Sequence, residues 1–352
     1  MVSEKNISRN LTSLVRQLLQ QLPVLITFLL VGAALVRVVG LGVGSLPSWM
    51  QFLLDRMSAF AVVFLSIVIE AAPFLLLGTL ASGIIEVFGS SADLARWVPR
   101  RPLLAALWGS LIGLFIPVGE VGVVPFARSL VDKGVPAAAA AAALLAVPVL
   151  NPIVIASTLA VFGAGPIFWG RIVLTLLIAV LTAVSFSAFA RPEVLRSGSA
   201  LIELPDDPAL RSPAFKDKLR RALLVMVDRT FAISRYLIPG AGLAAMIQSL
   251  VSQQVLLDAM HGPLSSILAV MGMAVLTSNG AVMDSYTANQ FSGTLTTPAL
   301  LAFLVFGPMV DIKNVMMFLH VFRPRAVAVL VVIPLLLTLL ITLVMGSTGF
   351  GW

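Results

Sequence analysis

The sequence of 352 residues contains no cysteine and only two histidines. Without thiols the chain can form neither disulfides nor thiolate metal sites. The histidines, His261 and His320, lie far apart in the chain and make no recognisable metal-binding spacing. The sequence also has no phosphate-binding loop, no G-x-S-x-G nucleophile motif and no H-E-x-x-H zinc motif. We therefore predict no metal site, no cofactor and no enzymatic activity.

Charged residues are also scarce: they make up 11% of the chain, against roughly 25% in an average soluble domain. Hydrophobic residues make up 59%, and several apolar runs exceed the roughly 20 residues that cross a bilayer as a helix. The net charge of +7 comes from basic residues in short loops, which indicates membrane topology and not nucleic-acid binding. We predict an all-α polytopic membrane protein that contacts the lipid bilayer and no nucleic acid.

Seven apolar spans are expected, and the polar N-terminal tail before the first lacks a small-residue cleavage site, which favours an uncleaved span over a signal peptide. The expected spans are Leu22–Val39, Met57–Phe88, Pro136–Phe162, Phe168–Ala190, Ala222–Leu250, Pro298–Leu319 and Ala326–Met345. Two of them are predicted to be interrupted, Pro136–Phe162 at Pro148–Pro152 and Pro298–Leu319 at Gly307–Asp311. Two further apolar segments, Leu103–Ile116 and Pro263–Leu276, are too short to cross comfortably.

Each of the two short segments runs into a stretch that cannot be an ordinary membrane helix. The first is Pro117–Pro125, which holds two prolines, two glycines and Glu120. The second is Ser278–Gly280. In hydrocarbon, broken backbone survives only where protein buries it or where it lines a wet cavity. A short helix, a break and another short helix predict a re-entrant hairpin in each half.

The two halves align at an offset of about 160 residues, which indicates an internal repeat of the kind common in transporters. Pro117-Val118-Gly119 matches Ser278-Asn279-Gly280, and Pro148–Asn151 matches Pro308–Asp311. Chance agreement between two Leu/Ala/Gly-rich halves is the alternative. The expected parts are an N-terminal tail with the first span (1–56), a first repeat (57–190), a cytoplasmic linker (191–221) and a second repeat (222–352).

The distribution of basic residues predicts the orientation. With the N-terminus in the cytoplasm, the basic loops around Arg96–Arg101, Lys133, Arg191–Arg221 and Arg323–Arg325 all fall inside. Each repeat then has three full spans and one hairpin, and the odd number inverts the second repeat. We predict two inverted repeats after an extra N-terminal span, in the plasma (inner) membrane, with the C-terminus outside.

The helix breaks are the expected binding site, because they expose backbone N–H and C=O groups that bind ions. The candidate solute- or ion-binding residues are Glu70, Gly119, Glu120, Gly122, Asn151, Ser278, Asn279, Asp284 and Asp311. Glu120 is the leading candidate for ion or proton coupling, since acids inside a membrane are rare and usually functional.

Each candidate also has a structural explanation. Glu120 could cap the helix that follows it, and Asp311 could form a local ion pair with Lys313. Glu70 could bond groups freed by Pro73, while the asparagines could satisfy broken backbone. The 13 methionines could form a soft-metal path, although flexible apolar filling explains them better.

These motifs resemble the predicted permease family that includes the organoarsenical-efflux-type permeases and the DUF318 group. The matching segments are Pro73–Gly78, Pro117–Pro136, Pro148–Val154 and Leu301–Asn314. The family pattern usually places two cysteines around the acid of the first break, where this chain has Gly119 and Val121. It also often has an aspartate at the position of Ala281. The resemblance therefore implies a permease without thiol-based recognition of arsenic.

We predict a secondary transporter that moves a small polar or ionic solute through a site between the two hairpin tips. One alternative is a non-transporting membrane subunit of a larger complex, docked through Arg191–Arg221. Another is an intramembrane hydrolase whose acids form a dyad. A homo-oligomer or an accessory subunit is compatible with the transporter.

Overall fold

The computed structural model describes residues 48–90, 96–189, 215–251, 260 and 262–348. The expected first span, Leu22–Val39, lies outside these residues, as do most of the expected linker and most of the loop Val251–Gly262. The chain divides into two compact units, Met1–Leu65 and Ser66–Trp352. The packing and the pocket described below belong to the second unit.

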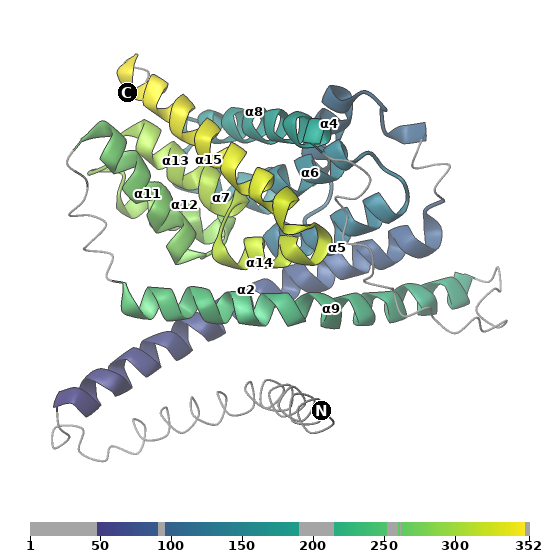
Figure 1. Ribbon diagram of the computed structural model, residues 1–352, viewed down its shortest axis with the longest axis horizontal. Helices are drawn as coiled ribbons and strands as arrows, with labels where there is room; N and C mark the ends of the chain where they lie inside the picture. The colour runs from purple at the N-terminus through teal and green to yellow at the C-terminus, as the bar shows by residue number, and fades with distance from the viewer. Residues whose placement is uncertain (1–47, 91–95, 190–214, 252–259, 261, 349–352) are drawn as a thin grey trace, which may run out of the picture. The chain divides into compact units, whose positions relative to one another are not determined.

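The described residues form helices throughout, in the same order in both halves (Figure 1). The first half contains α2 (Ser48–Phe88), α4 (Pro102–Leu111), η2 (Ile112–Leu114), α5 (Gly119–Asp132), α6 (Ala137–Ala146), α7 (Pro152–Phe162) and α8 (Pro166–Phe189). The second half contains α9 (Phe215–Leu250), α11 (Pro263–Thr277), α12 (Ala281–Gln290), α13 (Thr297–Met309), α14 (Ile312–Val321) and α15 (Pro324–Ser347).

Five stretches of the described chain are long and apolar enough to cross a membrane, which confirms a helical polytopic protein. They are α2, α8, α9, the pair α13 and α14, and α15. The expected span Pro136–Phe162 is instead divided into α6 and α7, each too short to cross alone. The division falls at Pro148–Pro152, where the sequence predicted an interruption.

The two most buried helices, α6 and α13, occupy corresponding places in the two halves. Helix α6 packs between α4 and α8, and α13 packs between α11 and α15. The alanine run of α6 is buried, and the small side chains let α4 approach closely. A Cβ atom added at Gly109 of α4 would lie only 2.0 Å from the carbonyl oxygen of Ala139. Helices α8 and α15 then contact each other across the halves (Figure 1).

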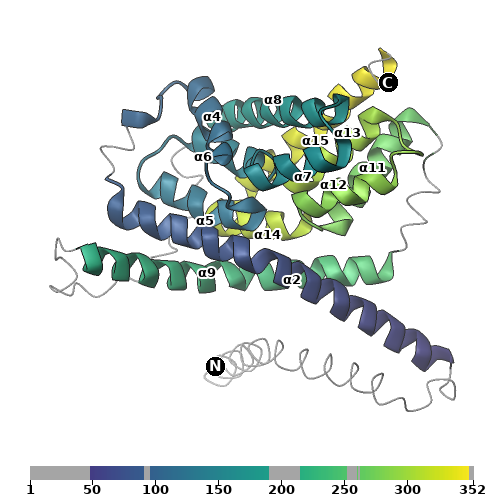
Figure 2. The ribbon, with the colours of Figure 1, turned by 180° about the vertical axis from the view of Figure 1, so that it is seen from behind.

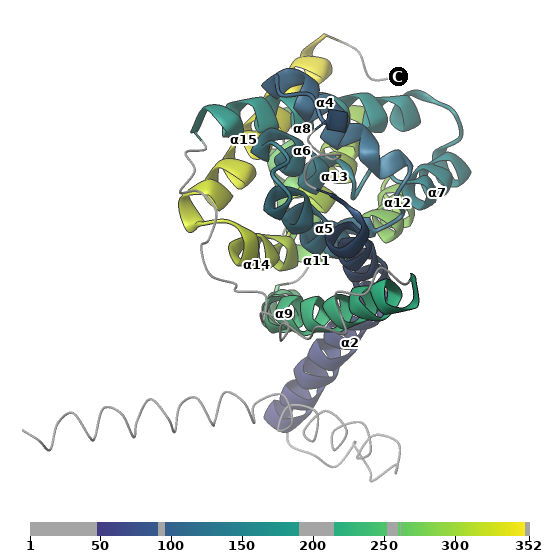
Figure 3. The same cartoon turned by 90° about the vertical axis from the view of Figure 1, so that its right-hand side faces the viewer.

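The helix that follows each break, α5 or α12, packs against the other half of the chain. Helix α12 lies beside α7, as seen from behind in Figure 2. Helix α5 lies beside α14, which in turn packs along α9 (Figure 3). The helices that follow the two breaks, α5 and α12, therefore each contact a short helix of the other half. These partners, α14 and α7, are the helices that follow the interruptions at Gly307–Asp311 and Pro148–Pro152.

The first break is shorter than the sequence predicted. It covers Phe115–Val118, and α5 runs from Gly119 through Pro125 without interruption, so the expectation of a break up to Pro125 was wrong. The helix tolerates this proline because protein surrounds it. The Pro125 carbonyl accepts hydrogen bonds from Ser129 Oγ (3.1 Å) and from Arg229 (3.4 Å). The second break, Ser278–Gly280, lies where it was predicted.

Candidate functional site

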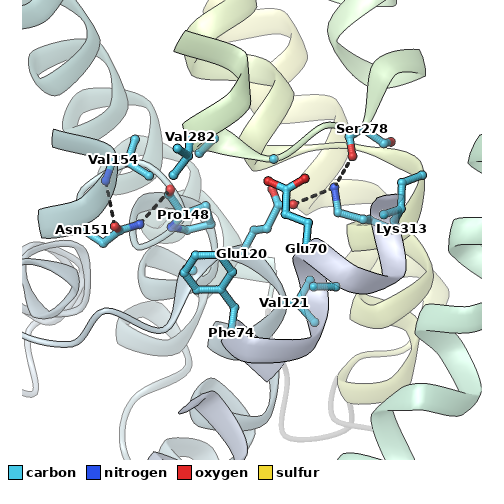
Figure 4. A pocket seen from close by; sticks show the side chains of 15 residues that line it. Glu70, Phe74, Glu120, Val121, Pro148, Asn151, Val154, Ser278, Val282 and Lys313 are labelled. Atoms are coloured by element: carbon cyan, nitrogen blue, oxygen red, sulfur yellow. Dashed lines mark hydrogen bonds and ion pairs between the residues drawn. The ribbon is translucent and has the colours of Figure 1, made fainter. Parts of the chain in front are cut away.

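Both breaks border one partly open pocket of about 400 Å³, a volume that includes open solvent at its mouth. Its wall comes from α2, the start of α5, the α6–α7 connection, the start of α12, and α14. Three charged side chains face it: Glu70, Glu120 and Lys313 (Figure 4). Five of the nine predicted site residues line this pocket, namely Glu70, Gly119, Glu120, Asn151 and Ser278.

Lys313 joins the first break to the second half of the chain. Its Nζ lies 2.6 Å from Glu120 Oε1 and donates a hydrogen bond of 2.8 Å to the Ser278 carbonyl oxygen. It also forms an ion pair with Asp311. Lys313 is 2% exposed and Glu120 is 8% exposed, so both side chains of this ion pair are buried. The expected local pair of Asp311 with Lys313 thus exists, but the same ammonium also reaches Glu120.

Glu70 approaches the second break at Gly280. A Cβ atom added at Gly280 would lie 2.6 Å from Glu70 Oε1 and 3.2 Å from Glu120 Oε1. Because Gly280 has φ +84°, a side chain there would also be strained. The glycine therefore lets the backbone of the second break approach two carboxylates. Among the described residues, no hydrogen bond or ion pair holds the Glu70 carboxylate, and the buried Glu120 Oε2 has no hydrogen-bond partner.

Asn151 and Asp311, which match in the predicted repeat, cap helices α7 and α14. Asn151 Oδ1 accepts hydrogen bonds from the backbone N–H groups of Ile153 (3.1 Å) and Val154 (3.0 Å) at the start of α7. Asp311 Oδ1 accepts a bond of 2.7 Å from the Asn314 N–H at the start of α14. Both side chains satisfy interrupted backbone, which was the structural alternative for the asparagine. Only Asp311 adds a charge.

The remaining predicted site residues lie outside the pocket wall. Gly122 packs against α2, where an added Cβ atom would lie 2.2 Å from the Phe74 carbonyl oxygen. Asn279 is half-buried within the second break. Asp284, on α12, is 2% exposed, its Oδ1 has no hydrogen-bond partner among the described residues, and its Oδ2 lies near Gly307.

A buried arginine, Arg171 of α8, holds α12, the helix that follows the second break. Its Nη1 donates hydrogen bonds of 2.7 Å to Thr158 Oγ1 on α7 and to Ser285 Oγ on α12. Its Nη2 donates to the Ala281 carbonyl oxygen at 3.0 Å. Asp284, which also lies on α12, interacts electrostatically with Arg171. One guanidinium thus connects two helices of the first half to α12.

Arg229 of α9 holds α5, the helix that follows the first break, in a similar way. It donates hydrogen bonds to Ser82 and Ser129, and its Nη2 pairs with Glu86 Oε2 at 3.1 Å. In both cases an arginine from one half contacts, in a helix of the other half, a backbone carbonyl and a serine hydroxyl one turn later. The contacted residues are Pro125 and Ser129 in α5, and Ala281 and Ser285 in α12.

Neither arginine was predicted as a site residue, although both lie inside predicted spans. Membrane arginines are as rare as membrane acids, and that rarity would have identified them. Lys313 was noted only as a neighbour of Asp311, because its contact with Glu120 joins residues far apart in the chain.

Comparisons with known proteins agree with a membrane permease. A family described as "Predicted permease" matches residues 56–347. "UPF0718 protein YcgR" of Bacillus subtilis (strain 168) is 38% identical over 274 residues, which cover 76% of this chain and 90% of that protein. A Streptococcus mutans protein (serotype c, strain ATCC 700610 / UA159), named "Putative two-component membrane permease complex subunit", is 32% identical over 296 residues, 81% of this chain and 94% of its own. No solved structure matches significantly.

Proposed function

Because the chain belongs to the predicted permease family, we propose that it is a secondary transporter that moves a small polar or ionic solute through the pocket between its two helix breaks. The observation that carries this proposal is the buried ion pair of Glu120 and Lys313 in the pocket wall. Charges inside a membrane protein are costly to bury, and they typically mark solute or ion pathways.

The arrangement of the two halves supports alternating access at this pocket. Both halves have the same order of helices, and each hairpin arm packs against the opposite half through α5–α14 or α7–α12. A relative movement of the halves would therefore reshape the pocket from both sides. Transporters built from inverted repeats place their sites at such a junction. The basic loops favour a cytoplasmic N-terminus, an external C-terminus and an inner-membrane location.

The candidate site residues have different proposed roles. Glu120 and Glu70 contact the solute or the coupling ion, and Lys313 with Asp311 balances their charge. Gly119 and Ser278 shape the two tips, because each has positive φ next to the pocket. Gly122, Asn151 and Asn279 act through the local backbone, and Asp284 acts through α12. No residue has an enzymatic role in this proposal.

We expect Glu120→Gln to reduce transport by about tenfold or more, because a neutral amide loses the charge-assisted bond to Lys313. The measurement is the charge-displacement current of proteoliposomes containing the full chain, during jumps across a panel of ions and small polar solutes. Asp217→Asn, which changes a carboxylate in the first turn of α9 outside the pocket, is the matched control. Unchanged current and unchanged pH dependence in Glu120→Gln would exclude the coupling role.

A second candidate function is favoured by the name of the Streptococcus mutans relative, which describes a subunit of a two-component permease complex. In that case this chain would transport only together with a partner protein. We expect affinity purification of the full chain from its native membrane to recover one stoichiometric partner, and co-reconstitution to restore flux that the chain alone lacks. Full flux by the isolated chain would exclude a required partner.

A further inference from the structure

Lys313 places its ammonium group among three oxygen atoms, as a bound cation would be placed. The oxygens belong to the Glu120 carboxylate, the Asp311 carboxylate and the Ser278 backbone carbonyl. An ammonium group has three N–H donors, so these acceptors use all of them. Carboxylates and backbone carbonyls are also the groups that bind hard cations in proteins and channels.

The pocket has more negative than positive charge. Among the described residues that line the pocket, Glu70 and Glu120 are carboxylates and Lys313 is the only cation. The ammonium of Lys313 contacts Glu120, and it also pairs with Asp311 outside the pocket wall. Arg171 interacts with Asp284 instead, so it does not supply the missing charge. Glu120 lines the pocket and is 8% exposed, and its buried Oε2 atom has no hydrogen-bond partner among the described residues. A buried charge without a counter-charge is costly, so the pocket favours a positive occupant.

Two helix starts also face the pocket and carry partial positive charge. Helices α5 and α12 begin there without a side-chain cap, a geometry that by itself would suit an anion. However, Glu120 occupies the first turn of α5, and Glu70 lies against Gly280 at the start of α12. An anion at either helix start would contact a carboxylate, and like charges at such distances repel strongly. The occupant is therefore cationic.

We propose that the pocket binds a small monovalent cation between Glu70 and Glu120, and that Lys313 is a tethered competitor that this cation displaces from Glu120. The displaced ammonium keeps its contacts with Asp311 and the Ser278 carbonyl. The ligand class is an alkali-metal ion or a small primary ammonium, which share the positive charge and the preference for oxygen ligands. The inference rests on the proposed function, because it names the ligand class of the same pocket.

The test compares cation-dependent thermal stability of the purified full chain in detergent. Na⁺, K⁺ and methylammonium are titrated as chloride salts against choline chloride at constant ionic strength, because a ligand that binds only the folded state raises the melting temperature. The main variant is Lys313→Met/Asp311→Asn, which removes the competitor and its second carboxylate together. Asparagine retains the cap of α14. The control is Lys133→Met, which alters a lysine that contacts Glu86 outside the pocket.

We expect the double variant to need about a tenfold lower concentration of at least one of the three cations for half-maximal stabilisation, since the loss of a charge-assisted bond to Glu120 is worth about that factor. Adding Glu70→Gln should remove this gain. Lys133→Met should respond like the parent chain. If the double variant does not fold, Glu70→Gln in the otherwise unchanged chain should still weaken the response to the same cation.

An equal response of the parent chain, the double variant and Glu70→Gln to all three cations would overturn the inference. The transport measurement with Glu120→Gln separates this outcome from failure of the proposed function. Glu120-dependent flux without any cation-dependent stabilisation would retain the permease and reject the cation site. If the double variant binds the cation more tightly than the parent chain and Glu70→Gln binds it more weakly, but the chain carries no flux, the cation site is retained and transport is rejected.

Discussion

Arg171→Met should lower the free energy of unfolding by about 3–5 kcal/mol, the range measured when one partner of a buried charged contact is removed. Arg171 is 1% exposed and bonds to Thr158, Ser285 and the Ala281 carbonyl oxygen. Methionine fills part of the volume but satisfies none of these groups. Asp284 would also remain buried without the guanidinium that interacts with it.

Thermal unfolding of the purified chain in detergent measures this effect. The control is Arg235→Met, which changes an exposed arginine of α9 and should stay within about 0.5 kcal/mol. Arg171→Lys should have an intermediate effect, because one ammonium cannot reproduce the fork that reaches α7 and α12 at once. A loss below about 1 kcal/mol for Arg171→Met would show that α12 is held by its packing and not by this contact.

The spans and interruptions of this chain can be predicted from the sequence because they depend on residues that lie close together in the chain. A membrane helix needs a long apolar run, and glycine or proline with polar residues marks where it stops. The interruptions at Pro148–Pro152 and Ser278–Gly280 follow from such patterns. The capping roles of Asn151 and Asp311 were likewise accessible, because a cap bonds only to backbone within the next three residues.

Contacts between residues that lie far apart in the chain could not be predicted from the sequence. The sequence contains Lys313 beside Asp311, but only the fold brings its ammonium to Glu120, 193 positions earlier in the printed sequence. Pro125 was predicted to lie in a break because a proline removes one helical hydrogen bond. Its tolerance depends on burial by the helices packed against α5, namely α6 and α14. Gly122 was predicted as a site residue because it lies close to Glu120 in the sequence, and the fold places it against α2. Its participation in binding stays a prediction.

Replacing Gly122 with alanine should cost about 3 kcal/mol or more, at or above the upper end of the range for overpacked cores. An added Cβ atom would lie 2.2 Å from the Phe74 carbonyl oxygen and 3.1 Å from the Cα atom of Gly78. The obstacles are backbone atoms, so no side chain can rotate away to make room. Helices α2 and α5 would have to separate, and these helices carry Glu70 and Glu120.

The matched control is Gly242→Ala in α9, because nothing lies within 4 Å of an added Cβ atom there. That change should be neutral or should stabilise the chain by about 0.5–1 kcal/mol, the usual advantage of alanine over glycine inside a helix. In thermal unfolding, Gly122→Ala should therefore lower the stability of the chain, whereas Gly242→Ala should leave it unchanged or raise it. The cation titration adds a second measure, since separation of α2 from α5 moves Glu70 away from Glu120 and should weaken the response of Gly122→Ala. Normal stability in Gly122→Ala would contradict the close contact of α2 with α5. Lost stability with an unchanged cation response would show that the spacing of these two helices does not control the pocket.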